Sequence, residues 1–181
     1  MVAWGKENVI LRKPDKSFAS EIRAYREEML LAGSSMDGTG TLRRQEDPLE
    51  WLKQNAIREN PETVPENRVP ATQFILTDTD TGRIYGMLQV RHELNEYLRQ
   101  FAGHIGYSVR PTERRKGYAK KMLRLALAYC KETLGLERVM VSCLVENEAS
   151  RRTILACGGV LEEKVFEHIE NVWLEKYWIA L

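Results

Sequence analysis

Two arginines and a lysine stand directly before a glycine at Arg114, Arg115, Lys116 and Gly117. Residues 103–111 have the pattern of a strand that Pro111 stops, and residues 117–134 have that of an amphipathic helix. The first backbone N–H groups of a helix have no partners inside it, and they carry the positive end of the helix dipole. Together with basic side chains they make an anion site, most naturally for phosphate. Glycine would let a diphosphate approach the main chain.

Other phosphate-binding loops do not fit the sequence. A Walker A loop needs two bracketing glycines followed by Lys and Ser or Thr, and this pattern is absent. A dinucleotide loop needs a third spaced glycine after a strand, whereas GTGTLR lacks that glycine and follows a helix. Nucleotide hydrolysis and hydride transfer are therefore poorly supported. An exposed turn before a helix also explains ERRKG, and the motif alone does not decide between these readings.

The elements that must position this turn alternate between strands and helices. We expect one domain over residues 1–181, a mixed α/β fold around a central sheet. The expected elements are a strand at 9–12, helices at about 15–31 and 48–60 around a loop at 33–47, a hairpin at 72–94, the strand and helix already described, a strand at 137–146, a short helix at 147–159, and a final hairpin that turns near Glu170 and Asn171.

Composition restricts the partners. The 27 basic and 26 acidic residues leave a net charge of +1, which argues against nonspecific nucleic-acid binding as the main role. No apolar run of about 18 residues is present, and MVAWGKENVILRKPDKS lacks signal-peptide features. We therefore expect no membrane partner and a cytoplasmic location. The three cysteines, Cys130, Cys143 and Cys157, should be buried thiols. The three histidines and three cysteines show no metal-ligand spacing.

The stretch V-R-P-x-x-R-R-K-G-Y-A, from Val109 to Ala119, resembles the acetyl-CoA signature of the GNAT superfamily of N-acetyltransferases. That signature is Arg/Gln-x-x-Gly-x-Gly/Ala after the fourth strand, and Arg114, Gly117 and Ala119 match it in register. The following helix and strand, then NEAS at 147–150 and CGGV, keep the family's order. The resemblance covers residues 72–180 well and the earlier residues only in the order of elements.

The resemblance implies a mostly antiparallel central sheet with helices on both faces, in which the fourth and fifth strands are parallel and splay apart. It also implies acetyl-CoA as the cofactor. The pantetheine arm would pair like an added strand with the fourth strand, and Asn147 would bind the same arm. The cofactor-binding residues implied are Tyr107, Ser108, Val109, Arg114, Arg115, Lys116, Gly117, Tyr118, Ala119, Lys120 and Asn147.

The implied reaction is direct attack of a neutral amine on the thioester carbonyl, with a backbone N–H near Val109 polarising that carbonyl. Many family members protonate the leaving thiolate with a tyrosine seven residues after the asparagine, but this chain has Ile154 there. Ser150 matches another branch, Asn-x-x-Ser, in which the serine is the proposed donor. Helix capping is the alternative role for Asn147 and Ser150.

Carboxylates and imidazoles near the splayed strands are candidates for the general base. Glu93, His104 and Glu146 fit this description, and His104 has a suitable intrinsic pKa. A structural histidine and a solvated strand end explain His104 and Glu93 as well. Acidic residues of the 33–47 loop, such as Asp37, could attract a cationic amine or only keep the loop soluble.

We therefore predict an acetyl-CoA-dependent N-acetyltransferase that acts on a primary amine of a small molecule or on a protein amino group. Ser150, His104 and Glu93 are its candidate catalytic residues. A non-catalytic acyl-CoA-binding or sensing domain is the alternative, which Ile154 keeps open. A nucleic-acid-binding role for RRKGYAKK is a weaker third reading. The sequence does not fix the oligomeric state, and a homodimer is compatible with it.

Overall fold

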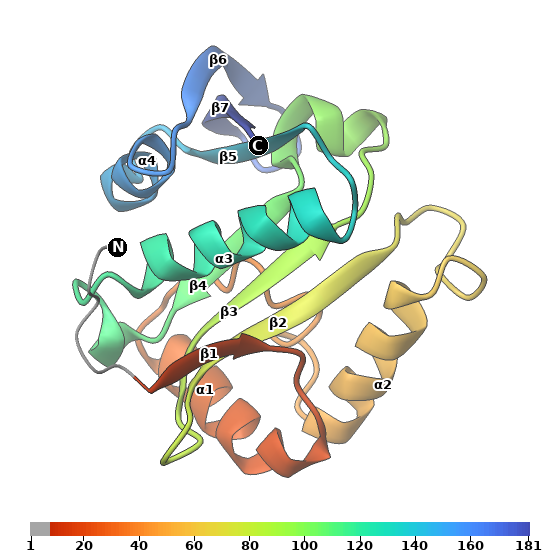
Figure 1. Cartoon of the computed structure of the whole chain (residues 1–181), viewed down its shortest axis with the longest axis vertical. Coiled ribbons are helices and arrows are strands. Elements are labelled where there is room, and N and C mark those ends of the chain that lie inside the picture. Colours follow the sequence, from red (N-terminus) through yellow and green to blue (C-terminus); the bar gives the residue numbers. More distant parts are fainter. Residues whose placement is uncertain (1–7) are drawn as a thin grey trace.

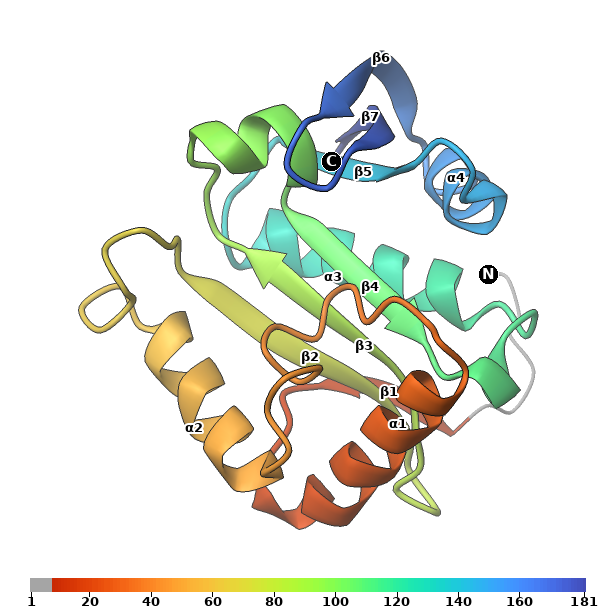
Figure 2. The ribbon, with the colours of Figure 1, turned by 180° about the vertical axis from the view of Figure 1, so that it is seen from behind.

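A computed structural model describes residues 8–181 as two β-sheets with helices packed against them (Figures 1 and 2). Residues 1–7, part of the stretch searched for a targeting signal, lie outside the described residues. The strands are β1 (Val9–Arg12), β2 (Ala71–Asp78), β3 (Ile84–Arg91), β4 (Ile105–Val109), β5 (Arg138–Leu144), β6 (Val160–Glu167) and β7 (Val172–Ala180). The helices are α1 (Ala19–Leu31), α2 (Pro48–Glu59), α3 (Tyr118–Glu132) and α4 (Glu148–Leu155), with short segments η1 (Lys16–Phe18), η2 (Leu98–Ala102) and η3 (Pro111–Glu113).

Every predicted strand and helix is present in the predicted order, and η2 is an addition that the sequence did not indicate. One sheet has the order β1-β2-β3-β4 and the other β5-β7-β6, and all ladders are antiparallel. In both views α1 and α2 cover one face of the first sheet and α3 covers the opposite face (Figures 1 and 2). This confirms the mixed α/β fold with helices on both faces.

Side chains that alternate along β2 and β3 build a separate core on each face of the first sheet. Ile75 and Met87 pack with α1 and α2, whereas Leu76 and Leu88 pack with α3. Such alternation follows from the two-residue period of a strand. On α3 the apolar stripe that the helical spacing predicts is buried at Met122, Leu123, Ala126 and Cys130, whereas its fifth member, Leu127, is half-buried.

The β4 and β5 strands are joined by hydrogen bonds only near their starts. The His104 N–H donates to the Met140 carbonyl at 2.8 Å, and Gly103 and Val141 form an isolated bridge of the antiparallel type. Farther along, the two ribbons diverge (Figure 2), and no ladder joins them within residues 8–181. The predicted parallel pairing of strands 4 and 5 is therefore not confirmed, because splayed strands are too far apart for a ladder. One consequence is that β4 is an edge strand.

No helix within residues 8–181 is both long and apolar enough to cross a membrane. The same residues contain no cluster of His, Cys, Asp and Glu that could hold a metal ion. All three thiols are free, with Cys130 and Cys143 buried and Cys157 half-buried.

Candidate functional site

The turn between β4 and α3 has the backbone conformation expected of an anion-binding loop. Arg115 has φ 64° and Gly117 φ 86°, both in the left-handed region. The first intrahelical bond runs from the Lys121 N–H to the Gly117 carbonyl at 3.1 Å, so the preceding N–H groups have no acceptor inside the helix. A Cβ on Gly117 would meet no atom within 4 Å. The glycine therefore serves the backbone conformation and leaves open space at the helix N-terminus.

The protein itself binds two of the basic side chains in this turn. Arg114 donates through Nε to the Val109 carbonyl at 3.2 Å and through Nη2 to Ser34 Oγ at 2.7 Å. Lys116 Nζ donates to Glu113 Oε2 at 2.9 Å, and this bond raises the pKa of Lys116. These contacts place Arg114 against the end of β4, and they turn Lys116 toward a carboxylate that the sequence did not single out.

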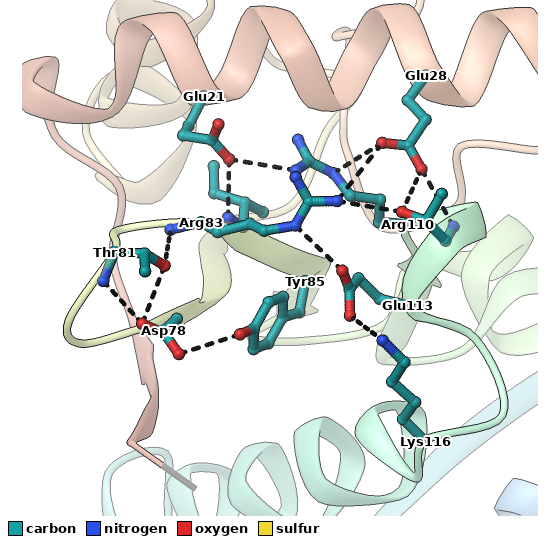
Figure 3. A network of polar contacts seen from close by, with 11 residues as sticks. Glu21, Glu28, Asp78, Thr81, Arg83, Tyr85, Arg110, Glu113 and Lys116 are labelled. Carbon is teal, nitrogen blue, oxygen red and sulfur yellow. Dashed lines mark hydrogen bonds and ion pairs between the residues drawn. The ribbon is translucent and has the colours of Figure 1, made fainter.

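Glu113 belongs to a charged network that holds the turn against α1 (Figure 3). Arg83 bonds Glu113 at 3.0 Å. The Arg110 side chain, 1% exposed, lies between Glu21 at 3.3 Å and Glu28 at 3.4 Å. Burial opposes ionisation of Glu28, yet hydrogen bonds from Thr112 and the charge of Arg110 keep its pKa below the ordinary value. Because removal of one partner from a buried ion pair is costly, this network fixes the position of the turn.

The exposed edge of β4 offers backbone groups to a ligand. The Arg91 N–H donates to the His104 carbonyl, and the Arg110 N–H donates to the Tyr85 carbonyl. The backbone N–H and C=O groups of even-numbered residues in and beside β4 therefore point toward β3. Because these groups point to opposite edges at alternate residues of an antiparallel strand, the backbone groups of Tyr107 and Val109 point away from β3. Ser108 faces α1, where its Oγ lies 3.0 Å from the Tyr25 hydroxyl. Of the predicted pantetheine-binding residues, Tyr107 and Val109 thus present their backbone to the open edge.

A pair of hydroxyl groups joins β4 to α4. The Asn147 side chain caps α4 by accepting from the Ser150 N–H at 3.1 Å, and Ser150 Oγ lies 2.9 Å from the Tyr107 hydroxyl. Burial raises the pKa of Tyr107 to about 12, so the phenol is protonated at neutral pH. Sequence reasoning used Tyr107 only for its backbone. No local pattern could have paired its hydroxyl with a serine on a distant helix.

Residues 8–160 match the family of acetyltransferase (GNAT) domains. The chain belongs to the GNAT family. The uncharacterized N-acetyltransferase YoaA of Bacillus subtilis is 30% identical over 93 residues, which are 49% of this chain and 51% of YoaA. This GNAT chain thus aligns with about half the length of that curated relative.

Solved structures agree with the GNAT fold. Ribosomal-protein-S5-alanine acetyltransferase from Vibrio fischeri superposes with a TM-score of 0.73 at 19% identity, covering 99% of this chain and 97% of the other. Spermidine N-acetyltransferase from Vibrio cholerae, in complex with CoA and spermine, has a TM-score of 0.67 at 19% identity over 96% and 95% of the two chains. At these identities the likeness establishes the fold alone.

Position 154 of this GNAT chain belongs to the core. Ile154 is fully buried, and a Cβ on Gly159 would lie 2.5 Å from its Cγ2. A tyrosine there would need room that the packing does not leave, since protein cores are close-packed. Ser150 lies one helical turn before Ile154 on α4, and its hydroxyl partner Tyr107 lies on β4.

The candidate bases differ in their surroundings. His104 is buried, and its Nδ1 accepts the Met140 N–H at 3.0 Å. Burial and the charge of Arg91 lower its pKa to about 4. Glu93 and Glu146 are exposed, Glu93 in the bend after β3 and Glu146 beyond β5 beside a cavity near the β6–β7 turn. The contacts of His104 favour a structural role for it, whereas the two carboxylates are exposed to solvent.

Proposed function

We propose that this GNAT chain binds acetyl-CoA and transfers the acetyl group to a primary amine of a small molecule or of a protein. The observation that supports this most strongly is the hydroxyl pair of Ser150 and Tyr107, 2.9 Å apart beside the open edge of β4. In the proposed reaction the amine nitrogen bonds to the thioester carbon, the carbon–sulfur bond breaks, and the thiolate gains a proton.

The residues around the β4–α3 turn fit the cofactor. The N-terminal amides of α3 and the open space at Gly117 suit a diphosphate, with Arg115, Lys116, Tyr118, Ala119 and Lys120 completing the turn. Arg114 would then hold the end of β4 in place for that turn, because its guanidinium bonds the Val109 carbonyl. The outward backbone of Tyr107 and the N–H of Val109 suit the pantetheine amides, with Ser108 between them in the strand. Asn147, at the N-terminus of α4, is the proposed further contact of the same arm.

Ser150 is the proposed donor to the leaving group, and Tyr107 is its proton source. A phenol whose pKa is about 12 keeps its proton at neutral pH and can pass it to a serine that has donated its own. Carbonyl polarisation would come from a backbone N–H at Val109. This assignment of the proton donor and of carbonyl polarisation requires no tyrosine on α4. It is therefore compatible with catalysis in a chain that has Ile154.

Of the candidate bases, Glu93 is favoured over His104. A neutral His104 whose Nδ1 accepts a hydrogen bond has its proton on Nε2, so neither nitrogen has a free lone pair. Glu93 is exposed at the end of β3 and can accept a proton from an incoming ammonium directly or through water. His104 instead joins the two sheets.

The second candidate function is an acyl-CoA-binding domain without catalysis, which the isoleucine at position 154 favours. Thiol release from acetyl-CoA, measured over amines, amino acids, polyamines and peptides, separates the two. Acceptor-dependent release supports the enzyme, whereas tight acetyl-CoA binding by calorimetry with no release from any acceptor supports the alternative.

A homodimer is also proposed. The dodecameric structure of the Vibrio cholerae spermidine N-acetyltransferase supports assembly in this fold.

Ser150→Ala tests the proposed donor. We expect turnover to fall about a hundredfold at saturating acetyl-CoA while the affinity for acetyl-CoA is kept, because only proton transfer is removed. Tyr107→Phe should lower turnover in the same direction. Ser20→Ala makes the same change on an exposed position of α1 and should leave turnover unaltered. Wild-type turnover in Ser150→Ala would remove the serine from the mechanism.

A further inference from the structure

We propose that a cavity between α2 and the loop after it binds an anionic group, a carboxylate or phosphate, of the acceptor. The assignment of this group to the acceptor rests on the proposed function, whereas the anion site itself does not. The cavity has a volume of about 230 Å³. It is lined by Thr41, Gln54, Asn55, Ile57, Arg58, Pro65 and Arg68.

The two arginines of this cavity have no acidic partner in the part of the chain that the structure describes. Within residues 8–181, neither Arg58 nor Arg68 forms a side-chain hydrogen bond or an ion pair, although fifteen other such pairs hold arginines and lysines elsewhere. Arg58 Nε is buried and lacks any hydrogen-bond partner in that part of the chain. A buried guanidinium N–H without an acceptor is costly. A bound anion would satisfy it.

A third arginine extends the positive charge toward β4. Arg91, at the end of β3, donates through Nη1 to the carbonyls of Ala102 at 3.3 Å and Gly103 at 2.9 Å. Burial and the nearby charge of Arg58 lower the pKa of Arg91 to about 10, and Asp37 opposes this shift. Burial and the charge of Arg68 lower the pKa of Arg58 in turn. Like charges are thus gathered at one place, which an anion would stabilise.

Distances to two glycine positions place this cluster on the face of the sheet that α1 and α2 cover. A Cβ on Gly106 of β4 would lie 3.9 Å from Arg91 Nη2. A Cβ on Gly40, in the loop between α1 and α2, would lie 3.3 Å from Gln89 Nε2 and 3.7 Å from Arg58 Nη1. Gln89 is paired with Gly106 across the two strands. The arginines therefore lie on the α1 and α2 face of the sheet, opposite the face that packs against α3.

The cluster is distinct from the proposed diphosphate site. Arg91 bonds the chain at the start of β4, whereas the turn at Arg114 to Gly117 follows the end of β4. The two positive sites thus lie at opposite ends of the strand beside which the thioester is expected. An acceptor that carries both an amine and an anionic group could seat the anion at Arg58 and present the amine to β4.

Matched acceptors test this inference. We would measure acetyl-CoA-dependent thiol release with O-phosphoethanolamine and with ethanolamine, which share the amine and differ in the phosphate. We expect kcat/KM for O-phosphoethanolamine to be higher by about tenfold or more. In Arg58→Gln the ratio of the two values should fall by about tenfold. In Lys53→Gln, which removes the same charge from an exposed position of α2, the ratio should not change.

Calorimetric measurement of inorganic phosphate binding tests the anion site without requiring turnover. Phosphate binding that Arg58→Gln abolishes and Lys53→Gln preserves supports the anion site, even where no amine is acetylated and the proposed function itself fails. Equal kcat/KM values for the two amines would overturn the assignment to the acceptor. Absence of phosphate binding to the wild-type chain, together with equal values, would overturn the site.

Discussion

At the scale of single residues, the Tyr107 hydroxyl changes what a chain with isoleucine at position 154 can do. It lies 2.9 Å from Ser150 Oγ, and burial raises its pKa to about 12. A serine alone is a poor acid, but a serine that is resupplied by a protonated phenol has a path for its proton. Loss of the helix tyrosine is therefore compatible with catalysis when a strand supplies the phenol instead.

Gly117→Glu should nearly abolish acetyl-CoA binding, because a carboxylate would stand where the diphosphate is expected. The substitution also strains a backbone with φ 86°, at a cost of about 1–2 kcal/mol. Gly135→Glu is the matched control. Gly135 has φ 66° and equally open surroundings, but it lies beyond the other end of α3. Calorimetry should show lost binding only for Gly117→Glu, and wild-type affinity in that variant would exclude the turn as the binding site.

Single residues show what local sequence can and cannot predict. The positions of Gly117 and Asn147 at the N-termini of α3 and α4 were predictable from the sequence, because a helix N-terminus needs particular residue types within a few positions. The Tyr107–Ser150 pair was not, since it joins residues 43 apart. The Glu113–Lys116 bond was not, since the motif suggested a phosphate rather than a carboxylate as the partner of the lysine. Arg58, whose Nε lacks a partner among the described residues 8–181, has no sequence signal at all, because an absent partner is a property of the fold.

At the scale of elements, one ion pair positions α4 and with it Ser150. Arg151, the next residue, donates through Nε to Glu175 Oε2 on β7 at 2.7 Å, and the same oxygen accepts the Tyr177 hydroxyl at 2.7 Å. Glu175 is buried. The bond from Arg151 is the main cause that lowers the pKa of Glu175 from 4.5 to about 2, against the effect of burial.

This shift gives a pH-dependent stability with a definite sign. Because the pKa of folded Glu175 is depressed, its contribution is complete above about pH 4.5 and is lost as the pH falls toward about 2. Glu175→Gln should therefore lower the free energy of unfolding by up to about 3 kcal/mol near neutral pH. The difference from wild type, measured by urea unfolding, should shrink at about pH 3. A difference that is constant across this range would contradict the depressed pKa.

The order and type of the helices and strands could be predicted from the hydrophobic period and the turn residues. The pairing of one strand with another could not. The strands at β4 and β5 were placed correctly along the chain, but their pairing was expected to be parallel, and only an isolated antiparallel bridge is present. Pairing depends on the hydrogen bond between His104 and Met140 and on the close approach at Gly103, neither of which leaves a periodic signal.

At the scale of the whole molecule, two sheets meet where β4 and β5 begin. A Cβ on Gly103, whose φ is 68°, would lie 2.4 Å from the Met140 carbonyl oxygen. On the other side of the junction, His104 bonds Met140 through both its backbone N–H and its ring. The separation of the two sheets beyond this point exposes the edge of β4, so the junction sets the geometry of the proposed cofactor site.

Gly103→Ala should force the sheets apart at this junction. We expect lower stability in urea unfolding, by about 2 kcal/mol or more from strain and overpacking, and weaker acetyl-CoA binding. Gly82→Ala is the control, because Gly82 has φ 73° with no atom within 4 Å of an added Cβ. It should show only the smaller cost of its backbone conformation. Equal losses in the two variants would mean that contact with Met140 contributes nothing.

The position of coenzyme A in a crystal structure of the complex tests the central claim most directly. The account predicts that the diphosphate contacts the amides at the start of α3 around Gly117, and that the pantetheine arm lies along the outward edge of β4 at Tyr107 and Val109. A diphosphate bound elsewhere, for instance at Arg58 and Arg68, or an arm that does not touch β4, would contradict it.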